Sequence, residues 1–219
     1  MHIDDSILKA YLNNVYFING TAYAGKSTVV RMIAERKGLI HCGENYGLKK
    51  FLSIATPDRF PNLCYFQTMS GWQEFVTRTP DEYAAWIANT ADEIAQFEVA
   101  ELMQLARDNK VIVDTNLSAD LLAQISDYDH VVFMLAPQEL SVNKFFDRSD
   151  PEKRFLLDEI DKTEDPAATL RNFREGLMKI NSQAVHDRYL NSGFKCVIRH
   201  GEDDDIEEKY NEIVAHFGL

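Results

Sequence analysis

The length, composition and charge of the chain set the first limits on its class. Its 219 residues suit one large domain with a substantial core, and its formal net charge of −12 argues against an extended nucleic-acid or anionic-membrane surface. The three cysteines, Cys42, Cys64 and Cys196, are far apart, so reduced thiols and a cytoplasmic location are expected. No apolar run approaches the roughly 18 residues of a membrane span, and residues 1–14 lack the pattern of a signal peptide.

Short apolar runs alternate with helical patterns along the chain. Strands are predicted at 15–19, 39–42, 110–114, 130–135 and 194–199. Helices are predicted at 25–38, over one or two long segments after the capping box that begins at Thr79, at 118–126, as one long helix over 165–193, and at 205–217. This order favours an α/β fold with a five-stranded parallel sheet covered on both faces, in which ligands bind at the carboxyl ends of the strands.

A glycine-rich motif follows the first predicted strand. Residues 20–27, GTAYAGKS, match G-x-x-x-x-G-K-[ST] at every fixed position, with a strand before and a helix after. In such a loop the backbone N–H groups wrap a phosphate, the lysine reaches the β- and γ-phosphates, and the serine places its hydroxyl on Mg²⁺. The motif predicts ATP and Mg²⁺ as ligands, held by Gly20, Thr21, Ala22, Tyr23, Ala24, Gly25, Lys26, Ser27 and Thr28.

With this motif near its N-terminus, the chain resembles the P-loop kinases of small molecules, which include the nucleoside, nucleotide, shikimate and gluconate kinases. Its size, a helical insertion between the second and third strands, and a basic segment after the fourth strand extend the resemblance over most of the chain. The resemblance implies a P-loop NTPase three-layer sandwich with sheet order 2-3-1-4-5. It further implies one domain over 1–219, with an acceptor-binding insertion at 45–109 and a lid at 137–165.

Two carboxylates are candidates for the reaction. Asp114 ends the third strand, where such a group would hold Mg²⁺; the alternative is a helix cap, although Ser118 fits that role better. Glu44 follows the second strand, as general base or Mg²⁺ contact, or as an exposed loop carboxylate. His41 is expected to be packed or hydrogen-bonded rather than to act as the base.

Basic and aromatic side chains supply the remaining candidates. Arg148, and less securely Arg154, would close from the lid on the transferred phosphoryl group; the alternative is a charged surface helix. The resemblance places the adenine ring near Arg199, which could stack on it; the alternative is a surface arginine. The aromatic residues of 59–78 either form the acceptor pocket or a small second core.

The sequence thus predicts an ATP- and Mg²⁺-dependent phosphotransferase acting on a small molecule, with a nucleoside or nucleotide as the first choice of acceptor. Catalytic roles are expected for Lys26, Asp114, Arg148 and Glu44, with metal contacts from Ser27 and Asp114. The alternative class is a nucleotide-dependent regulatory ATPase or switch, which would hydrolyse slowly without an acceptor. A nucleotide-binding protein without turnover is the third option. No membrane or nucleic-acid partner is expected.

Overall fold

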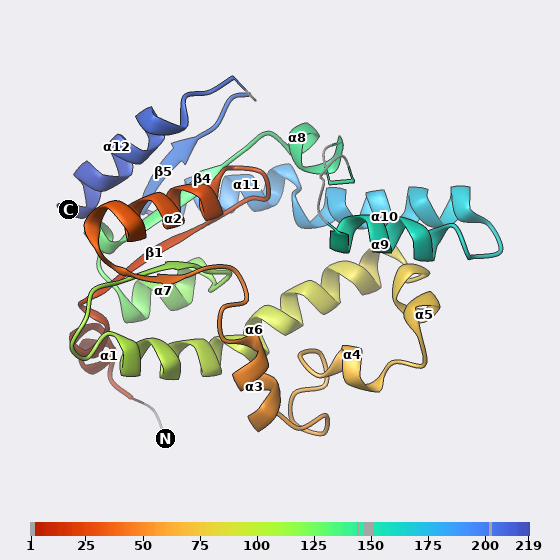
Figure 1. The fold of residues 1–219 in the computed structure, drawn as a ribbon, viewed down its shortest axis with the longest axis horizontal. Coiled ribbons are helices and arrows are strands. Elements are labelled where there is room, and N and C mark those ends of the chain that lie inside the picture. Colours follow the sequence, from red (N-terminus) through yellow and green to blue (C-terminus); the bar gives the residue numbers. More distant parts are fainter. Residues whose placement is uncertain (1–2, 144, 147–150, 202) are drawn as a thin grey trace.

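A single parallel sheet organises the chain. The computed structural model describes residues 3–143, 145–146, 151–201 and 203–219, with α-helices around five strands in the order β2-β3-β1-β4-β5 (Figure 1). All pairings are parallel, as the predicted α/β fold requires. The strands are β1 Val15–Gly20, β2 Ile40–Cys42, β3 Val111–Asp114, β4 Val131–Leu135 and β5 Lys195–Ile198.

Two layers of helices cover the sheet. Successive residues of a strand point to opposite faces, so Tyr16 and Ile18 of β1 pack on one side and Val15 and Phe17 on the other. The first face is covered by α2 Lys26–Lys37 and α12 Ile206–Phe217. The second is covered by α1 Asp5–Leu12, α6 Pro80–Leu105, α7 Ala119–Ile125 and α11 Gln183–Leu190. Figure 1 shows this three-layer arrangement, which brings the carboxyl ends of the strands to one edge.

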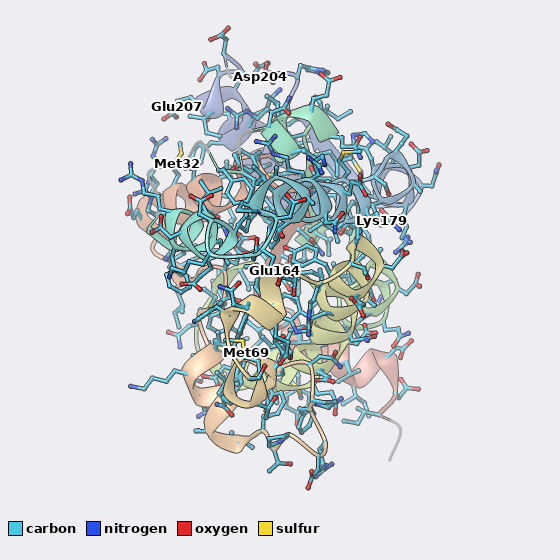
Figure 2. The ribbon with its side chains drawn as sticks, turned by 90° about the vertical axis from the view of Figure 1, so that its right-hand side faces the viewer. Met32, Met69, Glu164, Lys179, Asp204 and Glu207 are labelled. Carbon is cyan, nitrogen blue, oxygen red and sulfur yellow. The ribbon has the colours of Figure 1, made fainter. Side chains whose placement is uncertain are left out.

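Helices from the segment between β2 and β3 and from the segment after β4 form a second core beside the sheet. The remaining elements are the 3₁₀ helix Tyr128–His130 and α3 Leu48–Ile54, α4 Tyr65–Thr68, α5 Trp72–Val76, α8 Gln138–Asn143, α9 Pro151–Ile160 and α10 Pro166–Ile180. Phe75 and Tyr83 pack with Leu156, Ile160 and Phe173, which joins α5 and α6 to α9 and α10. This agrees with the second-core interpretation of the aromatic stretch. Figure 2 looks at this end of the molecule, with Met69 of the insertion well separated from Glu207 of α12.

The long helix α6 crosses from the sheet to this second core. Thr79 caps it as predicted: the Thr79 hydroxyl accepts from the Glu82 N–H at 3.3 Å, and the Glu82 carboxylate accepts from the Thr79 N–H at 2.8 Å. It is one helix of 26 residues. Within the described residues, no helix is long and apolar enough to cross a membrane.

The prediction of one helix over 165–193 is wrong. The chain leaves helical geometry at Asn181 and Ser182, and Ser182 takes an extended conformation (ψ 161°) that begins α11. The Asn181 side chain stabilises the break, because its amide donates to the Leu177 carbonyl oxygen at 3.0 Å. The break turns Asn181 toward the loop that follows β1.

Candidate functional site

The last residue of β1 and the loop that leads to α2, residues 20–25 together, are called the glycine loop below. Gly20 (φ 128°) and Gly25 (φ 93°) both take left-handed backbone conformations. A Cβ atom at Gly20 would lie 1.8 Å from the Met134 carbonyl oxygen, so only glycine fits beside β4. Tyr23, at the tip, is also left-handed (φ 65°), a conformation that is strained for a residue with a side chain. The backbone conformation of the loop therefore explains why both of these motif positions are glycine.

Gly20→Ala should destabilise the protein by about 2–3 kcal/mol, since the new methyl group forces β1 and β4 apart. Urea denaturation of both proteins measures the change. Gly38→Ala is the matched control: Gly38 is also left-handed (φ 69°), but an added Cβ there meets nothing within 4 Å. The control should lose about 1 kcal/mol from backbone strain alone. Equal losses in the two variants would show that the approach to Met134 does not matter.

Hydrogen bonds of Thr21 attach the glycine loop to β4 and the segment after it. Its backbone N–H donates to the Met134 carbonyl oxygen at 3.0 Å, and its hydroxyl accepts from the Ala136 N–H at 2.7 Å. Thr21 is buried, so both bonds are shielded from water. The start of the loop is therefore held in one position relative to the end of β4.

The tip of the glycine loop is held by residues far away in the sequence. The Ala22 N–H donates to the Asn181 side-chain oxygen at 3.3 Å. The Arg199 guanidinium, just after β5, donates to the Tyr23 carbonyl oxygen at 2.8 Å and to the Gly201 carbonyl oxygen at 2.8 Å. Arg199 thus contacts the backbone of the glycine loop; its predicted stacking on a base stays a prediction.

The start of α2 presents a lysine and open backbone donors. The Lys26 ammonium donates back to the carbonyl oxygens of Thr21 at 3.1 Å and Gly20 at 3.4 Å, so it lies over the glycine loop. In the described part of the chain no side chain caps α2, whose first N–H groups and dipole then face the loop. This arrangement is suited to a bound anion.

Ser27 and Asp114 connect α2 to the end of β3. The Ser27 hydroxyl donates to the Asp114 carboxylate at 2.8 Å. Asp114 is only 6% exposed, and burial raises its pKa, while Lys26 and Ser27 act in the opposite direction. The cap of α7 is Ser118, as expected, so Asp114 is free of that role.

These two oxygen ligands fit Mg²⁺, which prefers hard oxygen donors and usually keeps several waters and substrate phosphates as its remaining ligands. Among residues 3–143, 145–146, 151–201 and 203–219 there is no cluster of three or more His, Cys, Asp and Glu side chains suited to a metal. A dedicated all-protein metal cage therefore has no support in the described ranges, whereas a site completed by phosphate oxygens remains compatible with Ser27 and Asp114.

The loop after β2 brings Glu44 toward the same carboxylate. Glu44 is exposed, and its charge contributes to the raised pKa of Asp114. His41 lies close enough to lower that pKa, and it is exposed, so the packed alternative of the two expected for it does not hold. Glu44, which is exposed after β2, thus lies near enough to Asp114 at the end of β3 for the two carboxylates to interact electrostatically.

A buried carboxyl group in α6 belongs to this neighbourhood and was missed by sequence reasoning. Glu98 is 6% exposed, and its Oε1 atom has no hydrogen-bond partner among the described residues. Burial raises the pKa of Glu98 to about 7; a hydrogen bond from Thr115 opposes the rise and nearby Asp114 adds to it. The helical pattern of α6 gives no local signal for this placement, since Glu is common on helix surfaces.

The two arginines predicted for the lid, Arg148 and Arg154, are not among the residues placed so far. Arg148 lies outside the described residues, so its role stays a prediction. Arg154 is exposed on α9. Of the predicted site residues, the structure brings together those of the glycine loop, Lys26, Ser27, Asp114, Glu44 and Arg199.

Comparison with known proteins assigns no family. No protein-family model matches the chain, and no curated protein matches it significantly. The functional interpretation rests on the geometry of the glycine loop and on the side chains that surround it.

Proposed function

We propose that the chain is a phosphotransferase that moves the terminal phosphoryl group of ATP to a hydroxyl or phosphate group of a small molecule, with a nucleoside or nucleotide as the first choice of acceptor. The observation that carries the proposal is the joint placement of Lys26 over the glycine loop and of Ser27 against Asp114. Anion donors and oxygen ligands for a divalent cation then lie side by side at the carboxyl edge of the sheet. That combination is what a nucleoside triphosphate with Mg²⁺ requires.

The side chains divide the work as follows. The N–H groups at the start of α2 and Lys26 bind phosphate oxygens and stabilise negative charge as it develops on them. Ser27 and Asp114 would hold Mg²⁺, which supplies positive charge that neutralises the phosphate oxygens. Glu44 or Asp114 orients the acceptor hydroxyl and accepts its proton at a carboxylate oxygen. The bond from the γ-phosphorus to its bridging oxygen breaks as the bond to the acceptor oxygen forms, which leaves ADP.

The test is the release of ADP from Mg·ATP with a panel of nucleosides, nucleotides, sugars and shikimate-like alcohols. We expect one acceptor class to raise the rate well above the acceptor-free rate. Slow release of ADP that no acceptor stimulates would favour the regulatory ATPase over the kinase. Binding of ATP without any release would indicate a nucleotide-binding protein, and the absence of ATP binding would overturn the proposal.

A further inference from the structure

The strand β1 carries a buried polar residue, Asn19, just before the glycine loop. Asn19 is 1% exposed and follows an apolar run, VYFI. Because successive residues of a strand alternate between faces, Asn19 lies on the face of Val15 and Phe17, opposite the face that α2 covers. A buried amide costs free energy unless its polar atoms are paired. The partners of Asn19 therefore indicate what the residue does.

The side-chain amide of Asn19 forms hydrogen bonds in two directions. Its nitrogen donates to the Leu117 carbonyl oxygen at 2.6 Å, and its oxygen accepts from the Gly20 N–H at 2.5 Å. Gly20 begins the glycine loop, whereas Leu117 lies in the segment after β3, three residues beyond Asp114. The amide thus bridges the part of the candidate site that is suited to phosphates and the part that carries the carboxylate suited to Mg²⁺.

This bridge lies where β1 and β3 separate. The two strands are joined by a backbone ladder that pairs Ile18 with Asp114, and the Thr115 N–H still donates to the Ile18 carbonyl oxygen at 3.0 Å. Beyond this point the backbone of β1 turns away, and the Thr21 N–H is bonded to β4. The Asn19 side chain therefore takes the place of the backbone ladder across the opening between the two strands.

The segment after β3 is held on both faces of the sheet. On the face of the bridge, the Leu117 N–H donates to the Thr115 hydroxyl at 3.1 Å, and both residues are buried. On the α2 face, the Asp114 carboxylate accepts from the Ser27 hydroxyl at 2.8 Å. The bridge and the carboxylate thus lie on opposite faces, so Asn19 acts on Asp114 through the backbone that joins them.

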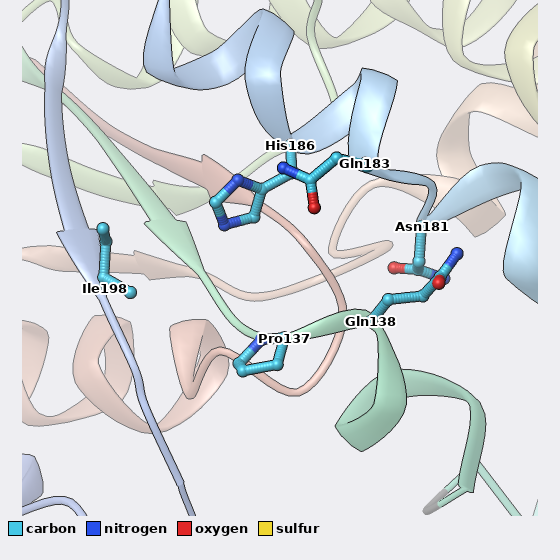
Figure 3. A pocket seen from close by; sticks show the side chains of 6 residues that line it. All are labelled: Pro137, Gln138, Asn181, Gln183, His186 and Ile198. Carbon is cyan, nitrogen blue, oxygen red and sulfur yellow. The ribbon is translucent and has the colours of Figure 1, made fainter.

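The glycine loop has further anchors that do not involve this bridge. Hydrogen bonds of Thr21 attach it to β4 and the segment after it, and the Ala22 N–H donates to the Asn181 side chain. Figure 3 shows Asn181 beside Gln138, beyond the end of β4, at a cavity that both residues line. Without the Asn19 bridge the loop keeps these bonds, and what it loses is its fixed distance from the segment after β3.

We infer that Asn19 is a positioning residue, which sets the distance between the glycine loop and Asp114 so that one Mg²⁺ ion can contact both the bound phosphates and the carboxylate. The inference rests on the proposed function, because it takes a triphosphate and Mg²⁺ to bind at this site. Mg²⁺ demands nearly ideal octahedral geometry with ligands at about 2.0–2.1 Å, so a small change in this distance weakens metal binding. Anion binding to the loop alone depends on it much less.

The experiment separates the metal from the anion. Isothermal titration measures the dissociation constant of ATP with Mg²⁺ and with a chelator, for the wild type, Asn19→Ala and Asn19→Leu. Asn19→Leu removes both hydrogen bonds but keeps most of the side-chain volume. We expect Mg²⁺ to tighten ATP binding in the wild type, and this gain to fall roughly tenfold in both variants, the usual effect of losing a group that orients a metal ligand. The dissociation constant in chelator should stay within about twofold.

Asn14→Ala is the matched control. The Asn14 amide also donates to a backbone carbonyl oxygen, that of Ala106 at 3.1 Å, but it lies at the other end of β1. Its gain from Mg²⁺ should equal that of the wild type, and a thermal melt of each variant reports whether the fold is retained. A second measurement needs no variant: hydrogen exchange of residues 115–117 in the wild type should slow when ATP binds in chelator, because the bridge ties this segment to the loop.

The outcomes distinguish the inference from the proposed function. An unchanged gain from Mg²⁺ in the Asn19 variants, or an equal loss of ATP affinity with Mg²⁺ and with chelator, would overturn the inference, as would slower exchange at residues 20–28 alone. ATP binding with the expected loss of the Mg²⁺ gain, but no transfer to any acceptor, would support the inference and remove the phosphotransferase. If the wild type binds no ATP under either condition, both fail.

Discussion

Lys26→Ala should lower the rate of ADP release with the stimulating acceptor by roughly 10²–10³-fold, the range found when one preorganised donor is removed from a developing negative charge. The Lys26 ammonium lies over the glycine loop, 3.1 Å from the Thr21 carbonyl oxygen, so it is already where phosphate oxygens would lie. The measurement is a coupled assay of ADP at saturating Mg·ATP. Titration with tripolyphosphate should show weaker binding in the same variant.

Lys37→Ala is the matched control for this variant. Lys37 is exposed at the other end of α2, so its removal takes the same charge from the same helix without touching the loop. We expect its rate to stay within about twofold of the wild type. A similar loss in both variants, or full activity in Lys26→Ala, would remove the lysine from the reaction and with it the main support for the kinase proposal.

Glu98→Gln should change how stability depends on pH. The pKa of Glu98 rises from 4.5 to about 7 on folding, so the folded chain holds the proton more tightly than the unfolded chain. The stability that this group contributes is therefore full below pH 4.5 and is lost as the pH rises toward 7. At about 1.4 kcal/mol per pKa unit, the free energy of unfolding of Glu98→Gln should rise relative to that of the wild type by about 3 kcal/mol between pH 4.5 and pH 7.

Urea denaturation at a series of pH values between 4 and 8, with a chelator present, measures this difference. Because the packing cost of the new amide is the same at every pH, it cancels in the comparison. Glu35→Gln, at an exposed position on α2, controls for the removal of one carboxyl charge. A difference between Glu98→Gln and the wild type that does not change with pH would show that Glu98 holds no such proton.

Much of the fold followed from the sequence because its signals are local. All five strands were expected within a residue or two, since short apolar runs bounded by turns and helices are typical of buried parallel strands. Their order, 2-3-1-4-5, came from the resemblance and is confirmed. The helices of the insertion were predicted least well, because α3, α4 and α5 are too short to show a helical period.

The residues of the candidate site also differ in whether a local sequence signal predicts them. Lys26, Ser27 and the glycines lie in one motif with fixed spacing, and Asp114 directly follows a recognisable strand. Asn181 reaches Ala22 across 159 positions of sequence, and only the break between α10 and α11 turns it there. Glu98 likewise gains its environment from packing, which no local pattern encodes.

The anchoring of the glycine loop has a consequence for affinity. Met134 and Ala136 at the end of β4, Asn181 after α10 and Arg199 after β5 hold its residues, so the loop has its shape before any ligand binds. Ordering a free backbone costs about 1–2 kcal/mol per residue, and here that entropy is lost once, during folding. An anion that binds the preorganised loop does not have to order it, so more of the interaction energy appears as affinity. Because the anion binds the folded protein and not the unfolded chain, its binding should also raise the melting temperature of the protein.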